Sequence, residues 1–379
     1  MTGFTTRTLH ALPELAQGAV VPPIYTASTF TQPTDGGEGP FEYQRSGNPT
    51  RSDLETTLAA LEGAAHAFAY STGMAATAAA LGLLESGQSI LMGNGVYGGT
   101  YRWATIELPR RGITHRFFAD LNTLTDEDFD ETVKMVFIET PSNPTLRVTD
   151  IRRVAKLAHR HGALVVVDNT FMTPYLQRPL ELGADITIQS ATKFLGGHGD
   201  LLAGVAATND DALAARLAQA QMISGGVLSP IDSHRLLQNI KTLALRMDRQ
   251  QANTAQIIRA LQEHPGVARI LQPGSHSSEE ARIHAEQASG DGAVFSMELS
   301  AGADVRAFLG QVKVFGFAVS LGGIESLICL PAHMTHGAYT PEHRADAQIG
   351  EELLRVAVGI EDAQDLIDDL TGALDAATR

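Results

Sequence analysis

Residues 185–200 read DITIQSATKFLGGHGD, and this run carries the strongest structural signal in the chain. Its short apolar segment Ile186–Ile188 is typical of a buried strand, and a polar loop with two hydroxyls and Lys193 follows it. Ligands of open α/β sheets bind at the carboxyl ends of the strands. A partly desolvated lysine there can form a Schiff base with an aldehyde, and the hydroxyls of Ser190 and Thr192 can bind phosphate. The alternative is a solvated surface lysine.

The flanking sequence alternates short apolar runs with helical stretches. Continuous apolar runs of this length are typical of strands covered on both faces, so the alternation predicts an α/β fold with a mostly parallel sheet. Residues 150–161 are an expected helix of this series, with Asp150 as its N-cap. The expected strands are Ala67–Ser71, Ser89–Met92, His115–Phe118, Met135–Glu139, Ala163–Asp168, Ile186–Ser190 and Gly204–Thr208.

Three parts are expected along the chain. Residues 1–50 are rich in Pro, Gly, Thr and Ser with little helical period, and we interpret them as an arm that contacts a partner subunit. Residues 51–247 are expected to form the large α/β domain, and residues 248–379 a smaller C-terminal α+β domain. A long helical pattern over 230–264 joins the two. The later expected elements are 293–299, 313–318, 353–358 and a closing helix from Asp362.

Two further strand ends carry candidate ligands. Asp168 ends the apolar run Val165–Val167, where a carboxylate can pair with a protonated pyridine nitrogen and make a bound ring a better electron sink. A turn or helix N-cap is an equally good interpretation of this aspartate. Residues 70–76, YSTGMAA, lead from a strand into an Ala-rich helix whose first N–H groups can bind phosphate. A close-packed helix start is the simpler alternative.

A competing motif lies at residues 93–98, GNGVYG. It fits the G-x-G-x-x-G pattern of dinucleotide-binding loops after a strand, and Asp120 follows at roughly the spacing of a ribose-binding carboxylate. A nicotinamide-dependent dehydrogenase is therefore an alternative. This single match leaves the Lys193 and Asp168 segments unexplained, so we rank it lower.

Composition restricts the partners. The chain has 379 residues, 44% of them hydrophobic and 19% charged, which is typical of a globular protein with about two domains. Its net charge of −15 disfavours nucleic acid and anionic lipid as partners. Cys329 is the one cysteine, and the chain has no His-Glu-x-x-His run, so we expect no metal site. No apolar run reaches the roughly 20 residues of a membrane helix, and no signal peptide is visible, so we expect a cytoplasmic protein.

Taken in order, these segments resemble the Cys/Met-metabolism family of pyridoxal-phosphate (PLP) enzymes, the trans-sulfuration enzymes that include cystathionine γ-lyases, β-lyases and γ-synthases. The similarity runs from about Thr6 to Leu374. It implies the PLP-dependent transferase fold of type I with a mostly parallel seven-stranded sheet, and a homotetramer of two catalytic dimers. The landmarks are YQRSGNPT at 43–50, STGMAA at 71–76, YGGT at 97–100, ETPSNP at 139–144, DNTF at 168–171, residues 190–200, SLGG at 320–323, MTH at 334–336 and residues 355–362.

The resemblance implies catalytic roles for Lys193, Asp168 and Tyr97. Lys193 is expected to bond to the PLP aldehyde and to remove the α-proton of an amino-acid substrate. Asp168 is expected to face the pyridine nitrogen, and Tyr97 to stack on the ring and act as a second acid or base. The same steps serve γ-elimination, β-elimination and γ-replacement, so these residues do not separate the family members.

The resemblance also implies binding roles. Arg355 is expected to hold the substrate carboxylate through two parallel hydrogen bonds, with Asn143 and Ser320 helping to place cofactor and substrate. The remaining expected cofactor contacts are Gly73, Met74, Thr170, Ser190 and Thr192, joined by Tyr43 and Arg45 of the partner subunit. The dimer would then be required for a complete site.

Two departures from the family pattern bear on the reaction. Gly99 stands where methionine γ-lyases usually carry Cys. Val319 stands where cystathionine γ-synthases and γ-lyases usually carry Glu, so a carboxylate able to bind the distal ammonium of cystathionine is missing. We rank an α,γ- or α,β-eliminating lyase of cystathionine or related thioethers first, a cystathionine γ-synthase second and a methionine γ-lyase last. A PLP-binding regulator would need a basic DNA-binding module, for which this acidic chain has no candidate.

Overall fold

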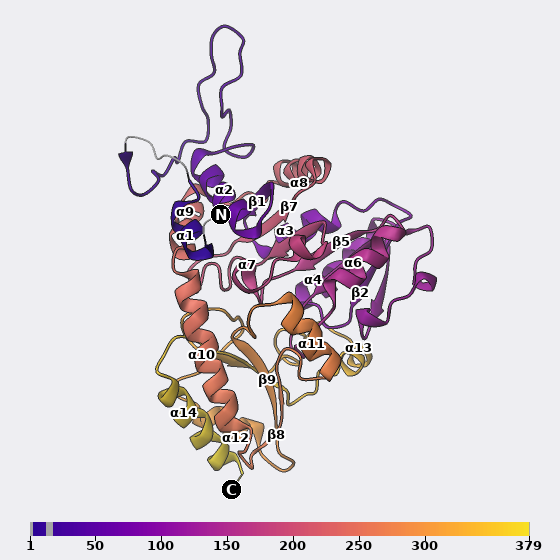
Figure 1. Ribbon diagram of the computed structural model, residues 1–379, viewed down its shortest axis with the longest axis vertical. Helices are drawn as coiled ribbons and strands as arrows, with labels where there is room; N and C mark the ends of the chain where they lie inside the picture. Colours follow the sequence, from indigo (N-terminus) through magenta and orange to yellow (C-terminus); the bar gives the residue numbers. More distant parts are fainter. Residues whose placement is uncertain (1–2, 13–17, 379) are drawn as a thin grey trace.

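We describe residues 3–12 and 18–378 of the chain in a computed structural model. The described residues form two sheets that lie one above the other along the long axis (Figure 1). The strands of the seven-stranded sheet are β1 (His66–Tyr70), β2 (Ser89–Gly93), β3 (Thr114–Phe118), β4 (Val133–Glu139), β5 (Leu164–Asp168), β6 (Ile186–Gln189) and β7 (Gly204–Thr208).

The strand order of this sheet is β1-β7-β6-β5-β4-β2-β3. Strands β3, β2, β4, β5 and β6 are parallel, whereas β7 is antiparallel to both of its neighbours. The predicted mostly parallel α/β sheet is therefore confirmed. Every expected strand is present, and β4 alone begins two residues before its expected start, at Val133.

Helices cover both faces of this sheet, which explains the unbroken apolar runs of its strands. One face packs against α3 (Gly73–Leu81), α4 (Gly98–Arg102) and α8 (Asp211–Ser224), and the other against α2 (Pro49–Glu62), α6 (Ile151–Arg160) and α9 (Pro230–Ile240). In β4 the side chains of Met135 and Phe137 join one core and those of Val136 and Ile138 the other. The side chain of Asp150 accepts a hydrogen bond from Arg153 N and caps α6 as predicted.

The second sheet has the strand order β10-β11-β12-β9-β8. The long helical pattern over 230–264 is not one helix, because Lys241 and Thr242 separate α9 from α10 (Leu243–Leu261). The expected element at 313–318 contains a strand of only two residues, Gly316–Phe317. The strands are β8 (Val267–Leu271), β9 (Val294–Leu299), β10 (Gly316–Phe317), β11 (Leu327–Cys329) and β12 (Leu354–Ala357). The remaining helices are α5 (Leu108–Arg110), α7 (Thr173–Leu176), α11 (Ser278–Gln287), α12 (Val305–Gln311), α13 (Pro341–Asp346) and α14 (Ala363–Ala377).

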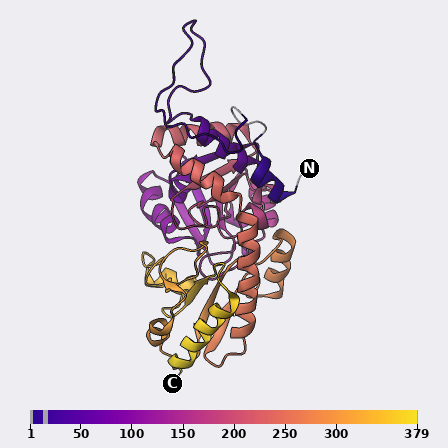
Figure 2. The same ribbon diagram turned by 90° about the vertical axis from the view of Figure 1, so that its left-hand side faces the viewer.

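The N-terminal part differs in one respect from the expectation. Phe4–His10 form a helix, α1, although the sequence shows little helical period there. Phe4 packs on Tyr175 with a ring-centroid distance of 5.1 Å, and this contact holds α1 against the large sheet's helices. Part of the segment 18–48 projects away from the rest of the chain as a long loop (Figure 2). Its contact with a partner subunit and the domain boundaries at 51 and 248 remain predictions.

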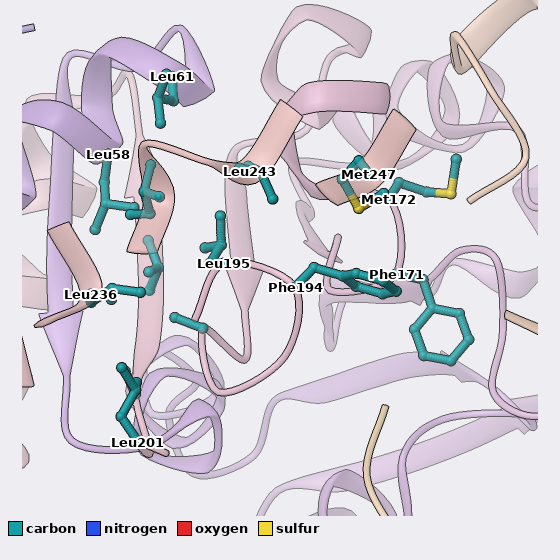
Figure 3. Packing of buried hydrophobic residues seen from close by; sticks show 14 of the residues in the cluster. Leu58, Leu61, Phe171, Met172, Phe194, Leu195, Leu201, Leu236, Leu243 and Met247 are labelled. Carbon is teal, nitrogen blue, oxygen red and sulfur yellow. The ribbon is translucent and has the colours of Figure 1, made fainter. Parts of the chain in front are cut away.

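The turn after Lys193 is packed against the first turn of α10. Phe194 and Leu195 are buried in one core cluster with Leu243 and Met247, and Figure 3 shows these four side chains close together. The Arg246 side chain donates from its guanidinium to the carbonyl oxygens of Phe194, at 2.6 Å, and Leu195, at 3.3 Å. The helix that leads to the second sheet therefore also supports the lysine-bearing turn.

Among the described residues, no helix combines the length and the apolar character that a membrane crossing requires.

Candidate active site

A cavity of about 230 Å³ lies where the carboxyl ends of β4, β5 and β6 face the second sheet. This is the position at which open α/β sheets bind ligands. Eleven of the residues that the sequence analysis selected line the cavity; they are Gly73, Met74, Tyr97, Asn143, Asp168, Thr170, Ser190, Thr192, Lys193, Ser320 and Arg355.

Lys193 reaches across the cavity to the second sheet's loop. Its Nζ donates a hydrogen bond to Ser320 Oγ at 2.7 Å. Burial, with a smaller contribution from the charge of Arg355, lowers the pKa of Lys193 to about 8. At neutral pH a larger share of this amine is therefore unprotonated than in an ordinary lysine, and an unprotonated amine is the form that attacks aldehydes and accepts protons.

Arg355 lies on β12 and faces the same loop. Its guanidinium donates to Asn143 Oδ1 at 3.0 Å and to the backbone oxygen of Ser320 at 2.7 Å. Its Nε atom is buried and has no hydrogen-bond partner within the described residues. Because its contacts are neutral, the charge of Arg355 remains available to an anionic ligand, and a carboxylate matches the planar donor set.

Ser320 adopts a φ of 95°, a backbone conformation that non-glycine residues rarely occupy. It makes two contacts at once, because its Oγ accepts from Lys193 and its backbone oxygen accepts from Arg355. Strained residues of this kind persist where the surroundings hold them, and they cluster at functional sites.

Asp168 ends β5, and its carboxylate is held by Thr170. Its Oδ1 accepts hydrogen bonds from Thr170 N at 3.0 Å and Thr170 Oγ1 at 2.5 Å. Burial raises the pKa of Asp168, and the two bonds from Thr170 oppose the shift. Thr170 Oγ1 in turn accepts from Ser190 N at 2.8 Å, so the ends of β5 and β6 are fixed relative to each other.

The start of α3 forms another wall of the cavity. The Thr72 side chain caps the helix by accepting from Ala75 N, and the N–H groups of Gly73 and Met74 at the first turn have no intrahelical acceptor. A Cβ atom at Gly73 would lie 2.7 Å from the Cβ of Ser190, so only glycine allows this approach. The wall thus combines free backbone donors with the hydroxyls of Ser190 and Thr192, a donor set suited to phosphate.

Glu139 is a cavity residue to which the sequence analysis gave no role. It ends β4 directly opposite Asp168 in the strand register, and its Oε2 accepts the backbone N–H of Tyr97 at 2.7 Å. Burial and the charge of Asp168 raise the pKa of Glu139 well above its ordinary value. A carboxylate at the end of an apolar run was the available signal, the same one that selected Asp168. Other lining residues without an assigned role are Thr72, Thr77, Thr100, Phe171, Leu202, Leu321 and Thr335.

Tyr43 and Arg45 do not line the cavity. The Tyr43 side chain is 46% exposed, Arg45 lies over its ring, and Arg45 donates to the backbone oxygen of Met222 at 2.7 Å. One chain therefore supplies the cavity without these two residues, which were expected to come from a partner.

The GNGVYG loop at 93–98 joins β2 to α4, which has five residues. The Asp120 side chain accepts from Asn122 N at 2.8 Å and so caps its own turn. Tyr97 is the member of this loop that faces the main cavity. The loop therefore contributes to the same cavity as Lys193.

The residues present fit PLP. A lysine amine with a lowered pKa suits the aldehyde, the Asp168 carboxylate suits the pyridine nitrogen, and the Gly73–Met74 turn with its hydroxyls suits the phosphate. The tight approach of Gly73 to Ser190 brings the two phosphate-binding groups together.

Comparisons with known proteins agree with the assignment of PLP as the cofactor. The family model described as "Cys/Met metabolism PLP-dependent enzyme" matches residues 5–375. The chain is 43% identical to a cystathionine gamma-lyase of Bacillus subtilis, covering 94% of this chain and 95% of that protein. It is 42% identical to a cystathionine beta-lyase of Lactococcus lactis, covering 99% and 100%. A crystal structure of cystathionine gamma synthase from Xanthomonas oryzae with cystathionine is 39% identical, covers both chains fully and has a TM-score of 0.94.

Proposed function

The chain belongs to the Cys/Met metabolism family of PLP-dependent enzymes, and from this we propose that it is a carbon–sulfur lyase that eliminates a thiol from L-cystathionine or a related thioether amino acid. Its cofactor is PLP. The observation that carries the proposal is the cavity in which the lowered-pKa amine of Lys193 and the charge of Arg355 meet at Ser320. This arrangement provides a base beside a carboxylate-binding group, which is what an α-amino acid requires.

The cofactor would be held at its ring nitrogen, at its ring face and at its phosphate. Asp168 would face its ring nitrogen, and Tyr97 its ring. Gly73 and Met74 would bind the phosphate through their N–H groups. When bound, PLP supplies an aldehyde for the lysine amine and a ring that accepts electrons from the substrate. The hydroxyls on the phosphate side are those of Ser190 and Thr192, with Thr170 holding Asp168.

Lys193 would take the α-proton. Its Nζ is already placed by Ser320 Oγ, and its lowered pKa of about 8 makes proton acceptance and return both accessible near neutral pH. Arg355, with Asn143 beside it, would fix the substrate carboxylate so that the α-carbon faces the amine. Tyr97, at the cavity wall, would move a second proton at the side chain that leaves.

A second copy of the chain would complete the site. The Tyr43–Arg45 pair lies outside the chain's own cavity, and a cation–aromatic pair on an exposed loop suits a phosphate in a neighbouring subunit. The proposed assembly is a homotetramer of two catalytic dimers in the cytoplasm.

Two residues bear on the substrate. Gly99 argues against a methionine γ-lyase, and Val319 argues against strict specificity for cystathionine. A Cβ atom at Gly99 would lie 2.6 Å from Tyr97 Cε1 and 2.7 Å from Met74 Sδ, so a larger residue there would displace both. At the mouth Val319 is 53% exposed and offers no charge to a distal ammonium. Related thioethers therefore stand beside cystathionine as candidate substrates.

Product analysis with cystathionine alone tests the proposal. Cysteine with 2-oxobutanoate identifies γ-elimination, and homocysteine with pyruvate identifies β-elimination. Lys193→Ala is the control and should produce neither. Absence of both products, together with condensation of an O-acyl-homoserine and cysteine, would instead identify a γ-synthase, the activity of the Xanthomonas oryzae neighbour.

A further inference from the structure

The loop that carries Tyr97 is held from two sides. On one side, Tyr97 N donates to Glu139 Oε2 at 2.7 Å. On the other, the hydroxyl of Tyr339 is within hydrogen-bond distance of two carbonyl oxygens of the loop, that of Asn94 at 3.0 Å and that of Val96, which is nearer still. Tyr339 is more than 240 residues away in sequence and lies two residues before the start of α13. Two distant parts of the chain therefore meet at this loop.

The Tyr339 side chain is fixed by its surroundings. It is 3% exposed, and its ring centroid lies 4.2 Å from that of Tyr101 and 4.5 Å from that of His343. His343 Nε2 makes a second polar contact with the Asn94 oxygen, at 3.2 Å. Because the ring cannot turn freely, the hydroxyl is aimed at the loop, and its one hydrogen is shared between two carbonyl groups.

The loop and the segment before α13 also approach closely at their backbones. A Cβ atom at Gly98, the residue after Tyr97, would lie 2.2 Å from the backbone oxygen of Thr335. Thr335 lines the cavity together with Tyr97. Only glycine permits this approach, so the loop lies directly on the Thr335–Tyr339 segment.

Tyr97 itself has few other constraints. Its side chain is 40% exposed, and its hydroxyl forms no hydrogen bond within the described part of the chain. The position of its ring therefore depends on the backbone of residues 94–98 and on the packing of the ring against Gly99.

We propose that Tyr339 is a positioning residue for Tyr97. Its hydroxyl fixes the Asn94–Val96 backbone while Glu139 fixes the Tyr97 amide, and together they hold the Tyr97 ring at the cavity wall. The proposal rests on the proposed function in one respect, which is that Tyr97 acts on the cofactor or substrate. The hold on the loop itself does not depend on the reaction.

The test uses Tyr339→Phe in the full-length enzyme loaded with PLP, which removes one hydroxyl and keeps the ring. Amide hydrogen exchange at residues 94–98 should become about fivefold faster, which corresponds to the loss of a buried hydrogen bond worth about 1 kcal/mol. The visible circular dichroism of the bound cofactor should change because its aromatic neighbour is less fixed. With a thioether substrate, kcat should fall about tenfold while KM stays within about twofold.

Tyr101→Phe is the matched control. Tyr101 is buried in the same ring cluster, but its hydroxyl makes no hydrogen bond to the loop. Loop exchange, the dichroism and the kcat of this variant should match the unaltered enzyme. A second variant, His343→Ala, removes the contact of Nε2 with the Asn94 oxygen together with one of the rings that pack on Tyr339, and it should also make loop exchange faster.

The outcomes separate this proposal from the proposed function. Unchanged loop exchange in both Tyr339→Phe and His343→Ala would overturn the hold on the loop, whatever the enzyme's reaction. Faster exchange with unchanged dichroism would show that the loop is held but that Tyr97 is not positioned by it. If the unaltered enzyme turned over no thioether, the proposed function would fail, while the exchange and dichroism would still decide the role of Tyr339.

Discussion

Glu62 is a buried carboxylate that the proposed mechanism does not use. It lies at the C-terminal end of α2, is fully buried, and accepts a hydrogen bond from Gln189 Nε2 next to Ser190. Burial raises the pKa of Glu62 to about 8, against the opposing effects of Gln189 and the charge of Arg178. The negative end of the helix dipole adds to the same tendency. We therefore expect Glu62 to be protonated at neutral pH.

Glu62→Gln should reduce the loss of stability that occurs as the pH rises from 4.5 to about 8. The folded state holds this proton up to about pH 8, whereas the unfolded state releases it near the ordinary value of 4.5. Between these values stability falls by up to about 1.4 kcal/mol per pH unit, and glutamine, which does not titrate, removes that part. The measurement is the melting temperature at pH 6 and pH 8.5. Equal losses in the variant and the unaltered protein would show that Glu62 is ionised when folded.

Val319 is an exposed, uncharged residue of the cavity wall, and a charged residue in its place should change the substrate preference. Val319→Glu should raise kcat/KM for cystathionine relative to methionine by about fivefold, since a partly exposed carboxylate–ammonium pair is worth about 1 kcal/mol. The control is Val319→Gln, which introduces a side chain of nearly the same shape as glutamate but without its charge. It should leave the ratio unchanged. If both variants shift the ratio equally, side-chain size and not charge sets the preference.

At the scale of elements, α10 supports the lysine-bearing turn through one arginine. Arg246 is 5% exposed, and besides Phe194 and Leu195 it donates to the backbone oxygen of Asn239 at 3.0 Å, near the end of α9. Burial lowers the pKa of Arg246 to about 10, which still leaves it charged at neutral pH. A cation held only by neutral oxygens ties two helices and the turn together.

Arg246→Lys should loosen the turn, because lysine cannot reach the three carbonyl groups in the same fork geometry. We expect a loss of about 2 kcal/mol in the free energy of unfolding and faster release of PLP on dialysis. Arg249→Lys, one turn away and 46% exposed, is the control and should change little. Equal PLP retention in the two variants would contradict the role of Arg246.

The elements were predictable to different degrees. Strands such as β5 and β6 were found because they are buried on both faces and read as unbroken apolar runs. The gap between α9 and α10 was missed because the apolar period continues through Lys241 and Thr242. The helix α1 was missed because only Phe4 among its residues packs as an aromatic anchor, on Tyr175, which is remote in sequence.

At the scale of the whole molecule, the proposed site needs two chains. Tyr43 and Arg45 are exposed and do not line the cavity of their own chain. Two variants that are each inactive, Lys193→Ala and Arg45→Ala, should therefore complement each other when their subunits are mixed. One site of each hybrid dimer then has an intact Lys193 and an intact Arg45.

The expected recovery in such a mixture is about a quarter of the unaltered activity, since half of the dimers are hybrids and each has one intact site. The measurement is lyase activity after joint refolding or subunit exchange, with each variant alone as the control. Recovery no greater than the sum of the separate variants would show that Arg45 does not act across the dimer.

The cavity itself could be predicted only in part from local sequence. Lys193, Asp168 and the Gly73 turn were visible as strand ends and a helix start. Arg355, on β12, and Ser320, in the loop between β10 and β11, lie more than 120 residues further along the chain, and no local pattern connects them to Lys193. Their expected roles came from the family resemblance, whereas Tyr339 has no signal of either kind because its contacts are purely tertiary.

The two hydrogen bonds that Ser320 accepts have a consequence for how the enzyme distinguishes ligands. An anion that draws Arg355 toward itself pulls on the backbone oxygen of the residue whose hydroxyl holds the lysine nitrogen. We therefore expect the acid group of a ligand to affect the position of the Lys193 nitrogen through Ser320 alone. Simple amines that lack the acid group would leave the Lys193 nitrogen hydrogen-bonded to Ser320 Oγ. Discrimination against such amines should therefore appear in the rate of proton removal as well as in the binding affinity.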